Sequence, residues 1–345
     1  MIALFPGQGS QHVGMAKELF ADFKVVRETF EEASDACHLE LKKLCFDGPD
    51  SDLTLTEHTQ PCLLTASVAA FRVAQRELGF VPHAVAGHSL GEYSALVAAG
   101  ALDLGTAAHW VRARGAAMQI AVPAGQGTMA AVLGAEDEMV ERLCIAATAA
   151  AKAKRSSDGT LSQVAGETVE WTVDAIVQPA NYNAPGQLVI AGSVDAVAEA
   201  IALLKAGGEF SGKAIPLSVS APFHCALMRP ARDRMADLFA KATSAQRPRA
   251  LDCAYVPNRT ARLTQESGVI LELLVEQVDH PVLWKQTVLT LANAGELRAV
   301  EFGPGKVLQG LLKRIGSPQG EPWVSSGVAD VAGVRALEAD LKGKK

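Results

Sequence analysis

The chain has 345 residues, of which 49% are hydrophobic and 20% are charged, and its 32 Lys and Arg against 38 Asp and Glu give a formal net charge of −6. The high apolar content excludes a disordered chain, and the acidic balance excludes general nucleic-acid binding through an overall positive charge. A chain of this length can bury a sizeable core without disulfide or metal staples. These numbers are typical of a globular protein of enzyme size.

Six cysteines occur without a C-x-x-C pair and without the spacing of zinc ligands, so we expect free thiols in a reducing compartment and no metal site. The N-terminus lacks the basic region of a secretory signal. No apolar stretch reaches the roughly 20 residues that span a bilayer. The sequence therefore predicts a cytoplasmic protein without a membrane-spanning segment.

The first third of the chain alternates short apolar strands, at 2–5 and 85–86, with helical patterns. Helices are predicted at about 13–22, 25–37, 62–78, 93–99 and 104–121. Asp103 is placed to cap the last of them. This alternation indicates an α/β domain with a largely parallel sheet.

The pattern changes between Gly125 and Ser218. Strands are predicted at 128–134, 186–192 and 213–219, helices at 135–151 and 194–206, and a polar surface loop or hairpin at about 152–172. We therefore predict a small α+β domain over 126–218, inserted into a larger domain made of 1–125 and 219–345. After the insertion, a helix is predicted at about 226–243 and strands near 252–256 and 298–302, whereas the tail from Gly316 is less well defined.

Residues 87–91 read GHSLG and match the G-x-S-x-G nucleophile elbow. In that motif a serine sits on a sharp turn between a strand and a helix, and the helix N-terminus favours negative charge that develops there. An apolar strand precedes Ser89 and a helix-forming stretch follows it, which supports a nucleophile over an ordinary tight turn.

A serine nucleophile needs a base, and His224 is the leading candidate. It follows a predicted strand and precedes a helix, where α/β folds build their sites. His88 adjoins Ser89, and neighbouring side chains in a turn point apart, while His280 lies before a proline in a predicted loop. A non-catalytic role for His224 is the alternative.

Arg114 falls on the apolar stripe of the predicted helix 104–121, in line with Trp110 and Met118, whereas Arg112 points away. A buried guanidinium needs an anionic or carbonyl partner. Arg114 is therefore either half of a structural ion pair or the ligand of a substrate carboxylate.

Two glycine-rich segments differ from the nucleotide-binding motifs that they partly match. The turn Pro6–Gln11 lacks the third glycine of a dinucleotide fingerprint, and residues 303–306 lack the flanking residues of a P-loop. The Pro6–Gln11 turn could instead bring backbone N–H groups to an oxyanion hole. No nucleotide or metal motif, and so no bound cofactor, is predicted.

Together these segments resemble the malonyl-CoA:acyl carrier protein transacylases, a family of fatty-acid and polyketide synthesis. The resemblance is carried by FPGQGSQ at 5–11, TQPCLLTASVA at 59–69, GHSLGEYSALVAAG at 87–100, the Arg114 segment, NYNAPGQLVIAG at 181–192, APFHCALMRPA at 221–231 and EFGPGKVL at 301–308. It implies an α/β-hydrolase-like large subdomain with a parallel sheet and an inserted ferredoxin-like small subdomain.

The resemblance also implies a role for each matching residue. Ser89 would carry the acyl ester with His224 as its base, and Arg114 would hold the malonyl carboxylate. The backbone amides of Gln8 and Leu90 would form the oxyanion hole. Two further matches are Gln277, whose main-chain carbonyl would orient the histidine, and Phe223, a bulky residue found before the histidine in malonyl-loading enzymes.

The implied activity is transfer of malonyl from malonyl-CoA to acyl carrier protein, through a malonyl-serine intermediate, by a monomer. Two alternatives remain: a serine hydrolase or thioesterase with the same residues, and a malonyl transacylase dedicated to a polyketide or malonate decarboxylase pathway. A non-catalytic scaffold is disfavoured because every expected catalytic position is filled.

The segment 152–172 looks longer than the family's loop, and its Lys152, Lys154 and Arg155 belong either to a solvated surface or to a contact with the carrier. Acyl carrier proteins are acidic, so an enzyme of charge −6 needs a local basic patch to bind one. The candidates for this patch are Lys285, Lys306, Lys313 and Arg314.

Overall fold

The computed structural model describes residues 1–158, 161–164, 167–170 and 172–343. The chain divides into two compact units. The first unit comprises Met1–Ala116, Leu238–Leu273 and Gln286–Lys345, and the second comprises Ala117–Asp237 and Leu274–Lys285. These units are defined by contacts in space, whereas the domains 126–218 and 1–125 with 219–345 were predicted from a change in the sequence pattern. The predicted domain boundaries therefore stay a prediction.

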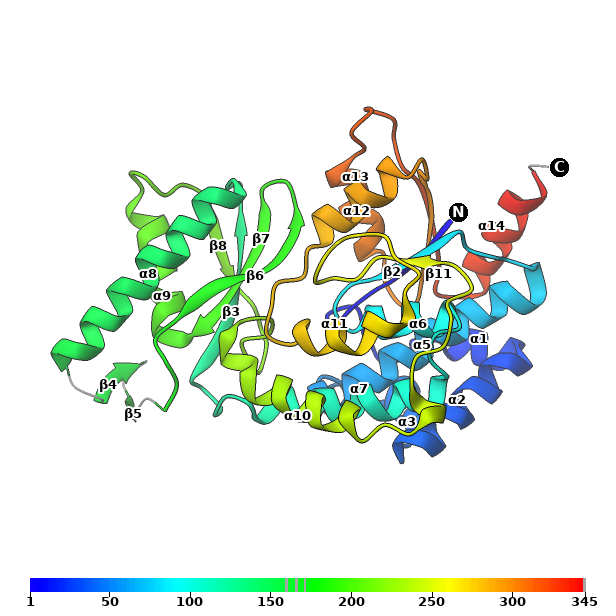
Figure 1. Cartoon of the computed structure of the whole chain (residues 1–345), viewed down its shortest axis with the longest axis horizontal. Coiled ribbons are helices and arrows are strands. Elements are labelled where there is room, and N and C mark those ends of the chain that lie inside the picture. Colours follow the sequence, from blue (N-terminus) through cyan, green and yellow to red (C-terminus); the bar gives the residue numbers. More distant parts are fainter. Residues whose placement is uncertain (159–160, 165–166, 171, 344–345) are drawn as a thin grey trace. The chain divides into compact units, whose positions relative to one another are not determined.

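The first unit is built on a five-stranded sheet (Figure 1). Its strands are β1 (Ile2–Phe5), β2 (Ala84–Gly87), β9 (Ala254–Tyr255), β10 (Arg298–Phe302) and β11 (Val324–Val328). They are arranged in the order β11-β10-β1-β2-β9, and every neighbouring pair is parallel. The α/β expectation is therefore confirmed, and the carboxyl ends of β1 and β2 lie side by side.

Helices α5 (Thr56–Leu78), α6 (Gly91–Ala98), α13 (Val307–Ile315) and α14 (Val331–Lys342) contact strands of this sheet. The helices from the N-terminus to residue 120 are α1 (Lys17–Asp22), α2 (Lys24–Cys37), α3 (Leu41–Asp47), α4 (Asp50–Leu53), α5 (Thr56–Leu78), α6 (Gly91–Ala98) and α7 (Leu104–Ile120). Those after residue 225 are α10 (Arg229–Ala240), α11 (Ile270–Glu276), α12 (Trp284–Asn293), α13 (Val307–Ile315) and α14 (Val331–Lys342). As predicted, Asp103 caps α7 by accepting the Thr106 N–H at 2.8 Å.

An aromatic cluster fixes the carboxyl end of β1 within the first unit. The rings of Phe5 and Phe302 stack with their centroids 6.0 Å apart, and Phe71 of α5 meets Phe302 edge-on at 5.3 Å. All three side chains are buried. The loop that follows Phe5 therefore leaves the sheet from a rigid point.

The second unit contains a four-stranded antiparallel sheet of β3 (Gly127–Leu133), β6 (Val177–Ala184), β7 (Gln187–Ser193) and β8 (Lys213–Pro216), in the order β6-β7-β3-β8. Helices α8 (Asp137–Asp158) and α9 (Val194–Ala206) share one apolar core with it. The succession β3-α8-β6-β7-α9-β8 is the split βαβ order of ferredoxin-like folds, as the resemblance implied. The strand β6 was not predicted.

The segment 152–172 contains both helix and hairpin. The prediction of a loop at 152–158 was wrong, because α8 continues to Asp158. Its hairpin alternative is confirmed for β4 (Leu161–Val164) and β5 (Glu167–Glu170), which pair antiparallel. Residues 159–160, 165–166 and 171 of this segment lie outside the described residues.

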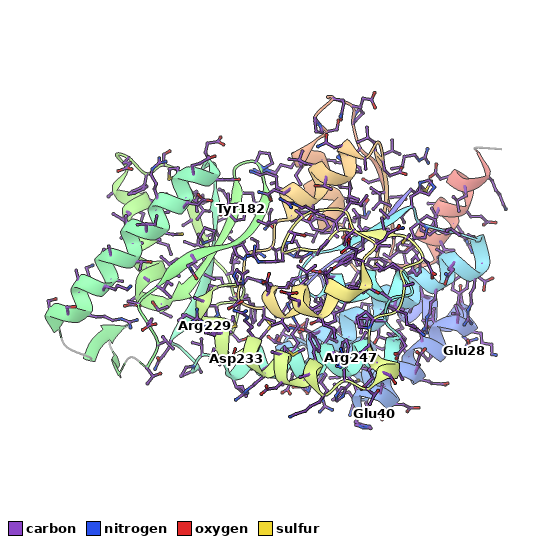
Figure 2. The ribbon with its side chains drawn as sticks, in the orientation of Figure 1. Glu28, Glu40, Tyr182, Arg229, Asp233 and Arg247 are labelled. Atoms are coloured by element: carbon purple, nitrogen blue, oxygen red, sulfur yellow. The ribbon has the colours of Figure 1, made fainter. Side chains whose placement is uncertain are left out.

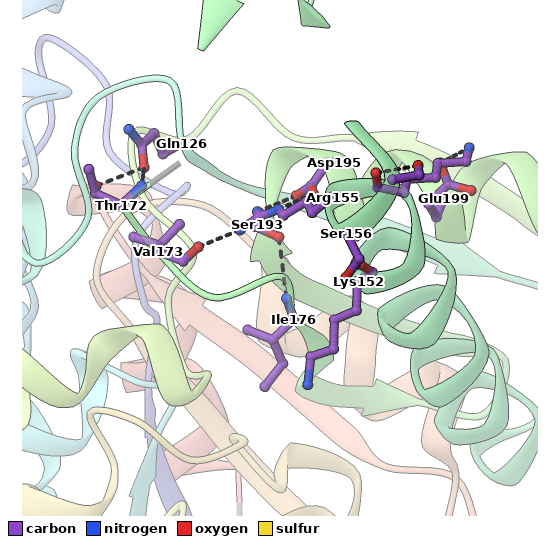
Figure 3. Close-up of polar contacts among 12 residues, drawn as sticks. Gln126, Lys152, Arg155, Ser156, Thr172, Val173, Ile176, Ser193, Asp195 and Glu199 are labelled. Carbon is purple, nitrogen blue, oxygen red and sulfur yellow. Dashed lines mark hydrogen bonds and ion pairs between the residues drawn. The ribbon is translucent and has the colours of Figure 1, made fainter. Parts of the chain in front are cut away.

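Ion pairs account for the extra length of α8 (Figure 3). Arg155 donates to both carboxylate oxygens of Asp195 on α9, from Nε at 2.7 Å and from Nη2 at 2.8 Å. Its Nη1 donates to the Val173 carbonyl at 2.5 Å. Lys154 pairs with Glu199, also of α9, at 2.5 Å. Two of the three basic side chains of this segment therefore bind carboxylates of the same unit.

All six cysteines are buried and free, as expected. Across the parts of the chain that the structure describes, none of the helices combines the length and the hydropathy needed to cross a bilayer.

Candidate active site

Ser89 occupies a sharp turn between β2, which ends at Gly87, and α6, which begins at Gly91. Its φ of 52° lies in the left-handed region, which costs a residue with a side chain about 1–2 kcal/mol. Neither Gly87 nor Gly91 leaves room for a side chain. A Cβ on Gly87 would lie 1.9 Å from the Gly91 carbonyl oxygen, and one on Gly91 would lie 2.1 Å from the Phe5 carbonyl oxygen. The motif therefore forms the strained elbow that the sequence predicted.

The turn after β1 packs against this elbow. The His88 N–H donates to the Phe5 carbonyl at 3.0 Å, and a Cβ on Gly7 would lie 2.5 Å from the His88 carbonyl oxygen. Gln8 follows Gly7 and donates through Nε2 to the Thr56 hydroxyl at 3.4 Å. The parallel pairing of β1 and β2 thus places Gln8 and Leu90 on adjoining turns.

Arg114 of α7 is 1% exposed and faces the elbow. Its Nη1 donates to Gln60 Oε1 at 2.9 Å, and its Nη2 donates to Ser89 Oγ at 3.1 Å. Its Cζ lies 5.8 Å from the centroid of the Tyr93 ring. Burial lowers the pKa of the guanidinium, while the nearby Tyr93 and Glu92 raise it. Because an arginine stays protonated in proteins, a fixed positive charge stands beside the Ser89 hydroxyl.

Two side chains that the sequence analysis did not single out also hold the elbow. Asn258 accepts the Ser89 N–H at its Oδ1 and donates through Nδ2 to the Gly87 carbonyl, both at 2.6 Å. Glu92 accepts the Asn258 backbone N–H at 3.1 Å and the Tyr255 hydroxyl at 3.1 Å. Glu92 could have been noticed as an acidic residue in the apolar helix that follows the elbow, whereas no local pattern marks Asn258.

His224 belongs to the second unit and also has left-handed backbone, with a φ of 60°. It is 4% exposed, and its Nδ1 lies 2.8 Å from the main-chain oxygen of Gln277. A carbonyl only accepts, so Nδ1 carries a proton, and in the neutral form of the ring Nε2 is the basic nitrogen. This is the contact that the resemblance implies. The preceding Phe223 is buried.

A pocket of about 300 Å³ adjoins His224 within the second unit. Figure 2 labels two of its lining residues, Tyr182 on β6 and Arg229 on α10. Asp279 also lines it and is bound on both sides, by Arg232 at 3.3 Å and by His280 at 2.7 Å. The pocket is therefore lined by a histidine and by two arginines, one of which, Arg232, is paired with Asp279.

The basic residues predicted to form a carrier-binding patch differ in their surroundings. Lys285 forms an ion pair with Asp137 in the second unit. Lys306, Lys313 and Arg314 are exposed at the two ends of α13 in the first unit. Within the described ranges, no group of three or more His, Cys, Asp or Glu side chains could hold a metal ion.

Each unit thus gathers part of the predicted residue set. The first contains Ser89, Arg114, Gln8 and Leu90, which come from α7 and from the turns after β1 and β2. The second contains His224 and Gln277, joined by a hydrogen bond. The first group can hold an anion beside a hydroxyl, and the second can accept a proton at a buried imidazole. Both are needed for acyl transfer through a serine.

Comparison with known proteins supports this chemistry. Residues 3–174 match the family model of the acyl transferase domain. The chain is 43% identical over 312 residues to the malonyl CoA-acyl carrier protein transacylase of Escherichia coli strain K12, covering 90% of this chain and 91% of that protein. It is 41% identical over 339 residues to the protein of that name from Haemophilus influenzae, covering 98% of each.

Solved structures agree with the sequence comparison. The chain superimposes on an acyl-carrier-protein S-malonyltransferase from Burkholderia pseudomallei 1710b with a TM-score of 0.84, at 41% identity and with 98% of each chain covered. A malonyl-transacylase solved in complex with its type II PKS acyl-carrier protein matches with a TM-score of 0.82, at 39% identity and with 98% and 99% of the two chains covered.

Proposed function

Because the chain belongs to the malonyl CoA-acyl carrier protein transacylase family and is an acyltransferase, we propose that it moves a malonyl group from malonyl-CoA to the phosphopantetheine thiol of acyl carrier protein through an ester on Ser89. The observation that carries this proposal is the buried Arg114, which donates to Ser89 Oγ at 3.1 Å. A guanidinium beside the attacking oxygen suits an acyl group that ends in a carboxylate.

In the first half-reaction, His224 takes the proton of the Ser89 hydroxyl, and Oγ attacks the thioester carbonyl carbon. The backbone N–H groups of Gln8 and Leu90 stabilise the oxyanion of the tetrahedral intermediate. The carbon–sulfur bond then breaks, and CoA leaves as a thiol with the proton that His224 held. The product of this step is malonyl-Ser89.

In the second half-reaction, His224 takes the proton of the carrier's phosphopantetheine thiol, and the sulfur attacks the ester carbonyl. Ser89 leaves as the alkoxide and regains the proton from His224. The protonation state of the enzyme after this step equals that before the first, and no atom changes its oxidation state, so the cycle balances without an external oxidant or reductant.

Arg114 supports a preference for malonyl over acetyl. An acetyl group supplies no carboxylate, so a guanidinium desolvated to bind one would lose that partner. Gln60 accepts from Nη1 and so orients the guanidinium toward Ser89 Oγ. A thioesterase for simple acyl chains does not need this arrangement, because such chains carry no terminal carboxylate for the guanidinium to bind.

The partition of malonyl-Ser89 between thiol and water tests the proposal against a hydrolase. The enzyme is loaded with malonyl-CoA, freed of excess CoA ester, and mixed with saturating holo-carrier or with buffer alone. We expect the malonyl group to appear on the carrier, with slow release of malonate when the carrier is absent. Release of free malonate as the main product at saturating carrier would support the hydrolase and refute the transferase.

The carrier itself is a separate question, because a relative at 39% identity was solved with a type II PKS acyl-carrier protein. We propose a role in fatty-acid synthesis. Transfer rates to fatty-acid and polyketide carriers, each measured over a concentration series, test it. A higher kcat/KM for the fatty-acid carrier is expected, and a higher value for the polyketide carrier would assign the enzyme to that pathway.

A further inference from the structure

The backbone of the elbow is held by a side chain that lies 169 residues away in the sequence. Asn258 bonds two backbone groups of the elbow, since it accepts from the Ser89 N–H and donates to the Gly87 carbonyl. Asn258 is fully buried, so water does not compete for these two bonds. The left-handed φ of Ser89 persists only if the surrounding structure enforces it.

The chemistry of the two partners selects an amide at this position. A backbone N–H only donates and a carbonyl only accepts, so one side chain that serves both must offer an oxygen acceptor and an N–H donor together. Asparagine does so. Aspartate would set an anion against the Gly87 carbonyl, and leucine would leave both backbone groups without this partner.

Glu92 in turn holds Asn258. Its two carboxylate oxygens accept the Asn258 backbone N–H and the Tyr255 hydroxyl, each at 3.1 Å, and all three residues are fully buried. Glu92 lies in the first turn of α6, where the helix N-terminus favours a negative charge. Burial raises the pKa of Tyr255 well above its usual value, so its hydroxyl stays protonated and keeps donating.

The bond to Asn258 also limits which amides can stabilise an oxyanion. The Ser89 N–H already donates to Asn258 Oδ1 at 2.6 Å, inside the protein. The nucleophile's own amide is therefore committed to the elbow. Within the elbow, that leaves the amide of the next residue, Leu90, to act with the amide of Gln8 on the developing negative charge, in agreement with the proposed mechanism.

We propose that Asn258, fixed by Glu92, is a positioning residue that holds the Ser89 elbow in the geometry needed to attack the thioester. The inference rests on the proposed function, because it takes Ser89 as the nucleophile. It adds a role for two residues that do not touch the substrate: they act through the backbone on either side of His88, one of the two bonded groups being the amide of Ser89 itself. The network should therefore govern the rate of Ser89 acylation rather than the affinity for malonyl-CoA.

The test is single-turnover malonylation of Ser89, followed by intact-protein mass spectrometry over a series of malonyl-CoA concentrations. In Asn258→Leu, which has a similar volume, we expect the maximum rate to fall about 100-fold, as a displacement of roughly 1 Å at a reacting atom can cause. The half-saturating concentration should change less than about threefold, because the Arg114 contacts are intact. A rate within threefold of wild type, or a loss confined to the half-saturating concentration, would overturn the inference.

Thr29→Val is the matched control for a merely structural effect. Thr29 is fully buried in α2 of the same unit, donates to the Val25 carbonyl at 2.7 Å and accepts from Arg72 at 3.1 Å. The Thr29→Val variant therefore loses one side-chain hydrogen bond as donor and one as acceptor, and Asn258→Leu loses the same number of each kind. We expect a similar fall in Tm with an unchanged acylation rate. If Thr29→Val slowed acylation as much as Asn258→Leu, general destabilisation would explain both.

Asn258→Asp decides the question if the leucine variant does not fold. The variant keeps the acceptor for the Ser89 N–H, and only its protonated form restores the donor to Gly87. The ratio of its acylation rate to that of wild type should rise by up to about tenfold for each pH unit lowered, until the protonated form dominates. Glu92, Tyr255, Tyr93 and Arg114 are also present in wild type, so their titration cancels in the ratio. A ratio independent of pH would contradict the inference.

A fluorophosphonate probe separates this inference from the proposed function. Such probes react with an activated serine whatever acyl group the enzyme transfers. If wild type fails to react with malonyl-CoA, the proposed function fails. The inference then still predicts slower labelling of Ser89 in Asn258→Leu than in Thr29→Val, and equal labelling rates would overturn it.

Discussion

Ser89 and His224 both have left-handed backbone, with φ values of 52° and 60°, yet the two residues are held by different means. Ser89 is held by side chains: Arg114 binds its hydroxyl and Asn258 binds its amide. His224 is bonded through Nδ1 to a main-chain carbonyl, that of Gln277. The serine should therefore depend on the identity of several distant residues, while the histidine should tolerate a change of side chain at the position that orients it.

The largest effect is expected at the nucleophile. Replacing Ser89 with Ala removes the oxygen that forms the ester, so transfer to the carrier should fall by about 10⁴-fold or more, as for other serine enzymes. The measurement is the steady-state transfer rate, with Tm as the control for folding. Transfer at a tenth of the wild-type rate or above would show that Ser89 is not the nucleophile.

Loss of the base should cost less. His224→Ala keeps the serine, the guanidinium and the proposed oxyanion donors, so the acylation rate should fall by about 10²–10⁴-fold, the usual contribution of a general base. Rapid-mixing acylation assays measure it. An effect below tenfold would return His224 to the non-catalytic alternative.

Arg114 tests the selectivity that we assign to the serine's surroundings. In Arg114→Ala, acylation by malonyl-CoA should fall about 100-fold, because a charge-assisted contact worth roughly 1.5–3 kcal/mol is lost. Acylation by acetyl-CoA should change by less than about threefold, since acetyl makes no such contact. The ratio of the two kcat/KM values is the readout.

Arg112→Ala is the matched control for Arg114. Arg112 lies on the same helix, faces another direction and donates to the Cys37 carbonyl at 2.5 Å. Its loss should leave the malonyl-to-acetyl ratio unchanged. An unchanged ratio in Arg114→Ala as well would return Arg114 to a structural role.

The smallest effect is expected at Gln277. Gln277→Ala removes a buried side chain but keeps the carbonyl that binds His224, so the acylation rate should fall only about threefold while stability drops by roughly 1–2 kcal/mol. Acylation kinetics and urea unfolding measure the two quantities. A rate loss comparable to that of His224→Ala would mean that the side chain orients the histidine, and would remove the contrast with Ser89.

Most of the fold follows from local patterns. The strand at 298–302 and the helix at 194–206 have the bounds that their apolar patterns predicted. The strand β6 was missed because register shifts interrupt its pairing and break the alternation of buried and exposed residues. The extension of α8 to Asp158 was missed because it depends on the Arg155–Asp195 pair, whose two residues lie on different helices and 40 positions apart in the sequence.

The candidate site divides in the same way. Ser89 is marked by the glycines around it, and Arg114 by its place on an apolar helix face, so both could be singled out from the sequence. Gln277 came only from the resemblance to the family, since a main-chain contact leaves no trace in residue type. Asn258 could not be found, because it acts through contacts with residues 169 and 171 positions away.

The account's central claim is that Ser89, beside the buried Arg114, carries the malonyl group. Incubation of the intact enzyme with malonyl-CoA, followed by mass spectrometry and peptide mapping, tests it most directly. We predict one malonyl adduct, on the peptide that contains Ser89, that disappears when holo-carrier is added. No adduct, an adduct on another residue, or an adduct that the carrier does not remove would contradict the account.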